Sequence, residues 1–233
     1  HNPPEYNGLK VYNEEGSQIT SEEADHIIRA IQQVEDELMI ETVATSYLYE
    51  HDLIQLLQDE VGAAYLKQLL FTSPYHEYEE DEQKELRVVF TPLHGTAAPL
   101  VTEGLRKLNF TDVHVVKEQT IADPEFSTVV SPNPEDPKAF TQAMELGKEV
   151  GAHILLATDP DADRLGVAVK NKRGTYETLT GNELGALLLD FILSQTDPRL
   201  LSNARMIKTI VTSELGRAIA SSYGVQTIDT LTG

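Results

Sequence analysis

The chain lacks cysteine altogether and is poor in basic residues. Without cysteine, its 233 residues can form no disulfide, no thiolate zinc site and no cysteine nucleophile. Its 18 Lys and Arg face 38 Asp and Glu, a formal net charge of −20. This excess argues against nucleic acid as a partner, because phosphate contacts need a basic face. No apolar run approaches the roughly 18 residues of a membrane helix, so we expect no membrane partner. The sequence also contains no HExxH motif, the pattern typical of zinc metalloproteases.

The remaining composition is that of an ordinary globular protein, 40% hydrophobic and 24% charged. The N-terminal residues do not resemble a signal peptide, because no charged start and apolar stretch occur there. The chain begins with His1 rather than methionine, and residues 230–233 directly follow an expected strand. We therefore expect a piece cut at both ends from a longer protein.

Alternating helical and β-rich segments predict an α/β fold. The expected class is α/β with mixed, mostly parallel sheets sandwiched by helices, one complete domain being flanked by partial ones. The first helix has a capping box, Thr20 with Glu23. The acidic run 77–82 reads as a solvated loop or a partner-binding patch. Helices are expected at 20–38, 48–58, 60–71, through Leu105 and Leu108, at 137–150 before a Gly151 cap, at 181–195 and at 213–223; strands are expected at 86–90, 113–116, 153–157, 165–169, 206–212 and 225–229.

The most informative segment carries three aspartates in alternating positions, Asp159, Asp161 and Asp163, followed by Arg164. It follows a buried strand, and ligands of open α/β sheets bind beyond the carboxyl ends of strands. In an extended loop these carboxylates can point to one side, where their repulsion calls for a divalent cation. With no imidazole or thiolate beside them, Mg²⁺ fits first, then Mn²⁺ or Ca²⁺.

The same aspartates could belong to an EF-hand or to a simple turn. An EF-hand loop needs Gly at its sixth position and Glu at its twelfth, but these positions hold Arg164 and Lys170, which excludes it. Plain turn residues at a strand end remain possible. The neighbouring Arg164 favours a ligand site, because a metal and an arginine together suit a phosphate group.

Two further segments carry polar groups of less certain meaning. Residues 1–10 contain one imidazole and one ammonium, His1 and Lys10, around an Asn7-Gly8 turn. Both could act as acid–base or phosphate groups, or could simply be solvated. The turn 91–96 joins a strand to a helix. It could present backbone amides to an anion or be only a tight connection.

Taken together, these segments resemble the α-D-phosphohexomutase family of phosphoglucomutases, phosphomannomutases and their relatives. The family's serine loop reads Ser-His-Asn-Pro and later Asn-Gly-x-Lys, matched here from His1 to Lys10. The metal loop reads Asp-x-Asp-x-Asp-Arg, matched from Asp159 to Arg164. Both motifs occur in the family's order, and the resemblance covers essentially the whole chain.

The particular residues within these motifs resemble those of the phosphoglucomutase branch, which also contains phosphopentomutases and glucose-1,6-bisphosphate synthases. The evidence is Ala162 in the metal loop, where many phosphomannomutases carry Gly, together with Thr-Pro-Leu-His-Gly, residues 181–184 and residues 230–233. The resemblance implies a four-domain enzyme. It places 1–59 at the end of domain one, 60–172 as the metal-binding domain two, and 173–233 as a truncated domain three.

The resemblance also implies a reaction, the interconversion of glucose 1-phosphate and glucose 6-phosphate through a phosphoserine and glucose 1,6-bisphosphate. Mg²⁺ is the implied cofactor and the cytoplasm the expected location. The implied roles are metal ligation by Asp159, Asp161 and Asp163, catalysis by His1, Lys10 and Arg164, and substrate binding by Arg164, Thr232 and Gly233.

Several alternatives stay open from the sequence. Within the family, the substrate could be a pentose or mannose phosphate. A metal-dependent sugar-phosphate phosphatase would also use aspartates at a strand end, although the haloacid-dehalogenase motif needs Thr or Val where Asp163 stands. A non-catalytic acidic module that binds metal weakly is the third possibility.

We predict that the isolated chain of 233 residues does not isomerise sugar phosphates. The family's nucleophilic serine immediately precedes the residue that matches His1, and Ser17, Ser21 and Ser46 lie outside the motif. A coupled assay that follows conversion of glucose 1-phosphate with Mg²⁺ and a trace of bisphosphate checks this. Measurable turnover by the isolated chain would contradict the prediction.

Overall fold

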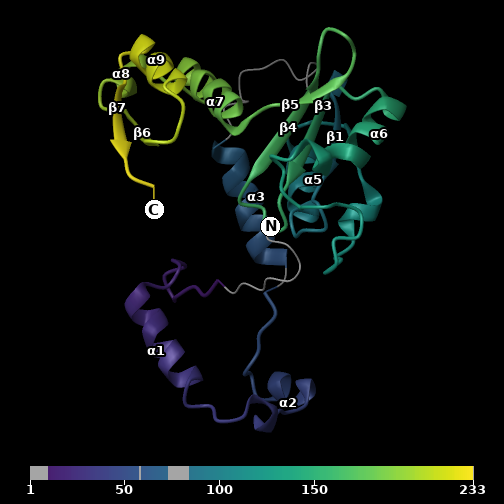
Figure 1. Ribbon diagram of the computed structural model, residues 1–233, viewed down its shortest axis with the longest axis vertical. Helices are drawn as coiled ribbons and strands as arrows, with labels where there is room; N and C mark the ends of the chain where they lie inside the picture. Colours follow the sequence, from purple (N-terminus) through teal and green to yellow (C-terminus); the bar gives the residue numbers. More distant parts are fainter. Residues whose placement is uncertain (1–9, 58, 73–83, 233) are drawn as a thin grey trace. The chain divides into compact units, whose positions relative to one another are not determined.

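The structure is a computed structural model that describes residues 10–57, 59–72 and 84–232 (Figure 1). The chain divides into two compact units, one of residues 5–63 and the other mainly of residues 64–233. None of the helices in the described ranges is long and apolar enough to cross a membrane. The acidic run 77–82 lies outside the described residues, so its interpretation stays a prediction.

The smaller unit contains short helices and, within residues 10–57, no buried side chain. Its elements are α1 (Ser21–Ile31), the 3₁₀ helix η1 (Glu37–Met39) and α2 (Thr45–Glu50). The predicted capping box of α1 is confirmed, because the Thr20 hydroxyl accepts from the Glu23 amide and the Glu23 carboxylate accepts from the Thr20 amide.

The two helices predicted in this unit extend less far than expected. The helix predicted over 20–38 ends at Ile31, and the one predicted over 48–58 ends at Glu50. Most helical stability in proteins comes from packing of an apolar face, and here Leu38 is 88% exposed. Asp52, with a left-handed φ of 53°, also interrupts the second helix.

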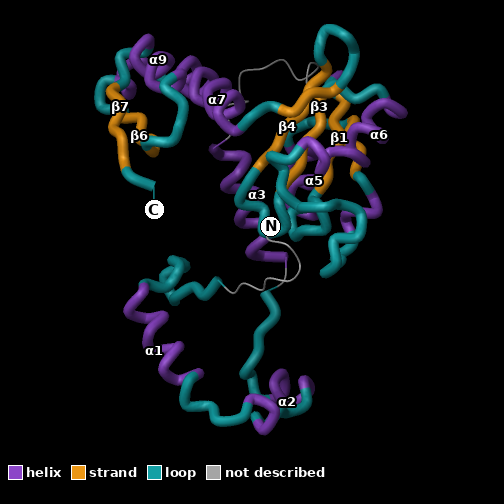
Figure 2. Tube along the Cα trace, viewed as in Figure 1, coloured by secondary structure: helices purple, strands orange, loops and turns teal. Residues whose placement is uncertain are grey.

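The larger unit is built on a five-stranded sheet in the order β2-β1-β3-β4-β5. Its strands β1, β3 and β4 are labelled in Figure 2. Strand β1 pairs in parallel with β2 and β3, while β4 runs antiparallel to β3 and β5 antiparallel to β4. The predicted mixed pairing is confirmed, and this sheet has two parallel and two antiparallel strand pairs. The strands are β1 (Arg87–Thr91), β2 (Asp112–Val115), β3 (Ile154–Thr158), β4 (Leu165–Lys170) and β5 (Tyr176–Thr178). The sequence did not predict β5, a three-residue edge strand.

Helices cover this sheet because its central strands are apolar on both faces. In β1, Val88, Val89 and Phe90 are all at most 2% exposed, and successive side chains point to opposite faces. Val89 joins the core that includes Phe140 and Leu155, against which α6 packs. The surrounding elements are α3 (Asp59–Thr72), α5 (Ala98–Lys107), η3 (Lys117–Thr120), η4 (Pro137–Phe140) and α6 (Thr141–Val150). Helix α6 ends at the predicted cap, Gly151, which has a left-handed φ of 72°.

A second, two-stranded parallel sheet follows, formed by β6 (Arg205–Thr209) and β7 (Gln226–Thr230). Three helices belong to this region: α7 (Gly181–Gln195), α8 (Pro198–Leu201) and α9 (Leu215–Ser222). Leu193, Leu201, Ala220 and Val225 form its buried cluster. The predicted elements are confirmed here, except that β6 ends at Thr209 and α8 was not expected.

Two cations and two carboxylates form an ion network near the carboxyl ends of β6 and β7. The Lys208 ammonium lies 2.8 Å from Glu214 and 3.2 Å from Asp229. The Arg217 guanidinium contacts the same two carboxylates at 2.6 and 2.5 Å. The hydrogen bond from Lys208 lowers the pKa of Glu214, and the one from Arg217 lowers the pKa of Asp229. Both carboxylates therefore stabilise the fold only while ionised.

We predict that Arg217→Met lowers Tm most at neutral pH. Carboxylates with a lowered folded-state pKa stabilise the fold above their unfolded pKa, about 4, and lose this contribution as the pH falls further. Thermal denaturation followed by circular dichroism from pH 7 to pH 3 should show the gap to wild type closing below about pH 4. Arg173→Met, in the exposed turn after β4, is the control. A gap that stays constant with pH would contradict the role of the network.

Candidate metal centre

The aspartates lie in the hairpin loop 159–164, which joins β3 to the antiparallel β4. The last register pair before the loop is Thr158 with Leu165. Strand β3 is parallel to β1, with Ala157 opposite Thr91, so the turn after β1 leaves the sheet at the same edge. The loop therefore occupies the carboxyl edge of two parallel strands, where the sequence predicted it.

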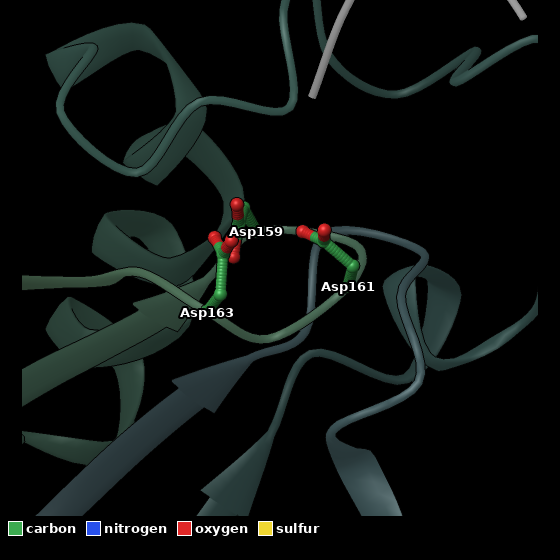
Figure 3. Close-up of side chains that lie close together, drawn as sticks. All are labelled: Asp159, Asp161 and Asp163. Atoms are coloured by element: carbon green, nitrogen blue, oxygen red, sulfur yellow. The ribbon is translucent and has the colours of Figure 1, made fainter. Parts of the chain in front are cut away.

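The three carboxylates gather in this loop. Asp159, Asp161 and Asp163 each offer one oxygen, and these oxygens all lie within 4.8 Å of one another. Figure 3 shows the three side chains turned toward a common point. Asp159 is fully buried, whereas the other two are exposed to solvent. The loop thus joins a fixed buried carboxylate to two that can adjust to a ligand.

Arg164 binds the buried carboxylate within the same loop. Its amide donates to Asp159 Oδ1 at 3.0 Å and its Nε donates to Oδ2 at 2.9 Å. Its Nη1 donates to Asn133 Oδ1 at 3.2 Å. Its Nη2 is buried and has no hydrogen-bond partner in the described part of the chain. A buried unpaired donor is costly, so this one suits an anionic ligand.

The donor set fits a hard divalent cation. Among the described residues, Asp159, Asp161 and Asp163 are the one group with metal-binding spacing, and it contains no histidine or cysteine. A carboxylate accepts at about four lone-pair positions, so one carboxylate can bind a metal and hydrogen-bond donors together. Oxygen-only ligands favour Mg²⁺, Mn²⁺ or Ca²⁺ over zinc.

The sequence interpretation missed two residues near the loop, Gly166 and Asn133. A Cβ on Gly166 would lie 2.2 Å from the Pro134 carbonyl oxygen, so the segment 132–134 contacts the backbone of β4 closely. Asn133 in this segment binds Arg164. A glycine inside an expected strand is a known sign of close backbone approach and could have indicated this contact.

The turn 91–96 is a tight connection rather than an anion cradle. The amide of His94 donates to the Gln119 carbonyl, that of Gly95 to Pro92, and that of Thr96 to Pro160. These amides are therefore already used within the protein. The helix α5 that follows begins at Ala98, beyond the turn.

The other predicted site residues are not tested by the described structure. Thr232 is exposed and follows β7. Lys10 is exposed and belongs to the smaller unit. His1 and Gly233 lie outside the described residues. Their roles in catalysis and substrate binding stay predictions.

The backbone at Ala162 is strained, with a left-handed φ of 63°. This conformation costs roughly 1–2 kcal/mol for an L-residue and more for a β-branched one. We predict that Ala162→Val lowers the free energy of unfolding by about 1–2 kcal/mol, whereas Ala162→Gly stays within about 1 kcal/mol of wild type. Urea denaturation measures both variants.

The matched control is Ala218→Val, at an exposed position in the helix α9. A right-handed helix accepts valine at a cost of only about 0.5 kcal/mol. Equal losses at positions 162 and 218 would argue against strain in the loop.

The chain is similar to known protein families and to known proteins. The family model described as phosphoglucomutase/phosphomannomutase, alpha/beta/alpha domain II, matches residues 63–174, and that of domain I matches residues 1–38. Together the two models span more than half of the chain. Proteins named phosphoglucomutase from Staphylococcus aureus strains MRSA252 and USA300 are 39% identical over all 233 residues. The chain spans 41% of their length.

Solved structures share the fold at lower identity. A putative phosphomannomutase from Thermus thermophilus matches the whole chain with a TM-score of 0.68 and 22% identity, over 47% of its own length. An N-acetylglucosamine-phosphate mutase of the α-D-phosphohexomutase superfamily matches the whole chain with a TM-score of 0.55 and 17% identity, over 63% of its length.

Proposed function

The chain belongs to the phosphoglucomutase/phosphomannomutase family, and we propose that it supplies the metal centre of a phosphoglucomutase. The reaction is the interconversion of glucose 1-phosphate and glucose 6-phosphate through a phosphoserine and glucose 1,6-bisphosphate. The main support is the group of three carboxylates beside Arg164, within a chain that is 39% identical to proteins named phosphoglucomutase. The expected location is the cytoplasm.

In this proposal Asp159, Asp161 and Asp163 hold Mg²⁺, which offsets the negative charge on the phosphoryl group during transfer. Arg164 binds a phosphate oxygen through Nη2, the buried donor that has no partner in the described structure. The contact between Arg164 and Asp159 keeps this guanidinium oriented toward the loop. Phosphoryl transfer depends mainly on such positioning and charge stabilisation.

The remaining roles follow the family's motifs. The phosphoryl donor is the serine that precedes the residue matching His1 in the family's loop. Lys10 and His1 act as acid–base or electrostatic groups beside the sugar hydroxyl. Thr232 and Gly233 contact the substrate. We keep the domain boundaries at 1–59, 60–172 and 173–233, supported by the domain II match over residues 63–174.

We predict that Asp161→Asn weakens binding of Mg²⁺ or Mn²⁺ by about tenfold or more, because it removes one of three anionic ligands. Isothermal titration of the 233-residue chain with each ion measures this. Asp25→Asn, an exposed aspartate on α1, is the matched control and should bind as wild type. Equal affinities in wild type and Asp161→Asn would exclude the loop as the metal site.

The reaction itself is tested in a protein that joins this chain to the segments completing its relatives' length. Glucose 1-phosphate, mannose 1-phosphate and ribose 1-phosphate are compared with Mg²⁺ and a trace of sugar bisphosphate. Preferred conversion of glucose 1-phosphate, lost in Asp161→Asn, supports the proposal. A preference for mannose or ribose changes the substrate, and steady release of free phosphate contradicts the mutase reaction.

A further inference from the structure

The turn of residues 92–96 approaches the metal loop too closely for any side chain to fit at its centre. A Cβ on Gly95 would lie 2.3 Å from Pro160 Cα and 2.5 Å from the Pro160 carbonyl oxygen. Gly95 does not have a left-handed φ, so its backbone conformation is open to other residues. Glycine is therefore needed at this position for contact with the loop.

The same turn holds the loop by hydrogen bonds. The Pro160 carbonyl accepts from the Thr96 amide at 3.0 Å and from the Thr96 hydroxyl at 3.3 Å. Pro160 stands between the first two aspartates of the metal loop. This carbonyl belongs to the peptide bond between Pro160 and Asp161. Holding it in place therefore fixes the backbone that leads into Asp161.

The turn is held by a network of side chains in which Thr91, His94 and Gln119 are buried and Thr128 is half-buried. His94 Nδ1 lies 2.7 Å from the Ile121 carbonyl, which can only accept, so Nδ1 carries the hydrogen. His94 Nε2 then accepts from the Thr128 hydroxyl at 2.7 Å. The Thr128 hydroxyl accepts from Gln119 Nε2, and Gln119 Oε1 accepts from the Thr91 hydroxyl.

Every hydrogen bond of this network has one consistent direction, and Gln119 and Thr91 are completely buried. A fully satisfied buried network fixes a single conformation. Here that conformation is an unfavourable one, because Leu93 and His94 have left-handed φ values of 48° and 66°. Strain of this kind persists only where the surroundings enforce it, and it is common at functional sites.

We propose that the turn 92–96, held by the His94–Thr128–Gln119–Thr91 network, positions the metal loop and so sets its affinity for the cation. This inference rests on the proposed function, because it takes the loop 159–163 to be a metal site. The turn contacts the loop at Pro160, through Gly95 and Thr96. The turn thereby connects the end of β1 to the ligand loop at the end of β3.

The test compares two glycine variants of the whole chain. Gly95→Ala should bind Mn²⁺ about tenfold or more weakly in isothermal titration, the usual loss when support of a metal ligand is removed. Gly147→Ala is the matched control, because its Cβ would meet the Leu155 and Tyr176 side chains instead of the loop backbone. It should lose stability and keep its Mn²⁺ affinity. Hydrogen exchange of the peptide 158–165 without metal should rise in Gly95→Ala alone.

A second pair of variants tests the network without a steric clash. Thr128→Val removes the hydroxyl that joins His94 to Gln119, and it should weaken Mn²⁺ binding several-fold. Thr128→Ser keeps the hydroxyl and should restore the affinity. This pair carries the test if Gly95→Ala does not fold.

The outcomes separate this inference from the proposed function. Wild-type Mn²⁺ affinity in both Gly95→Ala and Thr128→Val, despite a lower Tm, would overturn the positioning role and leave the metal site in place. Equal loss of affinity in Thr128→Ser and Thr128→Val would overturn the role of the hydroxyl network. Absence of Mn²⁺ binding by the wild-type chain would overturn the proposed metal site and, with it, this inference.

Discussion

Electrostatic repulsion among three carboxylates is the constraint on which the candidate site depends. Asp159, Asp161 and Asp163 bring oxygens within 4.8 Å of one another, an arrangement that like charges disfavour. The β3–β4 hairpin holds the loop ends together by strand pairing, and Arg164 offsets the charge of the buried Asp159. A divalent cation bound by all three carboxylates would reduce their mutual repulsion.

The loop is supported by close backbone contacts with two other segments. Gly95 allows the turn after β1 to contact Pro160, and Gly166 allows Pro134 to contact the start of β4. Both contacts are incompatible with a Cβ. Each contacting segment also binds the loop by hydrogen bonds, through Thr96 in one case and Asn133 in the other. The metal loop is therefore held by its own strands, β3 and β4, and also by the turn after β1 and the segment 132–134.

Local sequence signals predicted much of this structure. The clustering of the alternating aspartates, the capping box at Thr20 and the helix cap at Gly151 each depend on a few neighbouring residues, and the structure shows all three. The predicted end of the first helix, residue 38, was wrong: α1 ends at Ile31, and Leu38 beyond it is largely exposed. The Asn133–Arg164 and Gly95–Pro160 contacts join residues far apart in the sequence, so no local pattern specifies them.

The central claim is that the loop 159–163 binds a divalent metal, and anomalous diffraction tests it most directly. Crystals of the chain soaked in Mn²⁺ should give one strong anomalous peak among Asp159, Asp161 and Asp163, with metal–oxygen distances of about 2.1 Å. Crystals of Asp161→Asn under the same conditions should lose that peak. A saturating Mn²⁺ soak that leaves this loop without a peak, or places the peak elsewhere on the chain, would contradict the account.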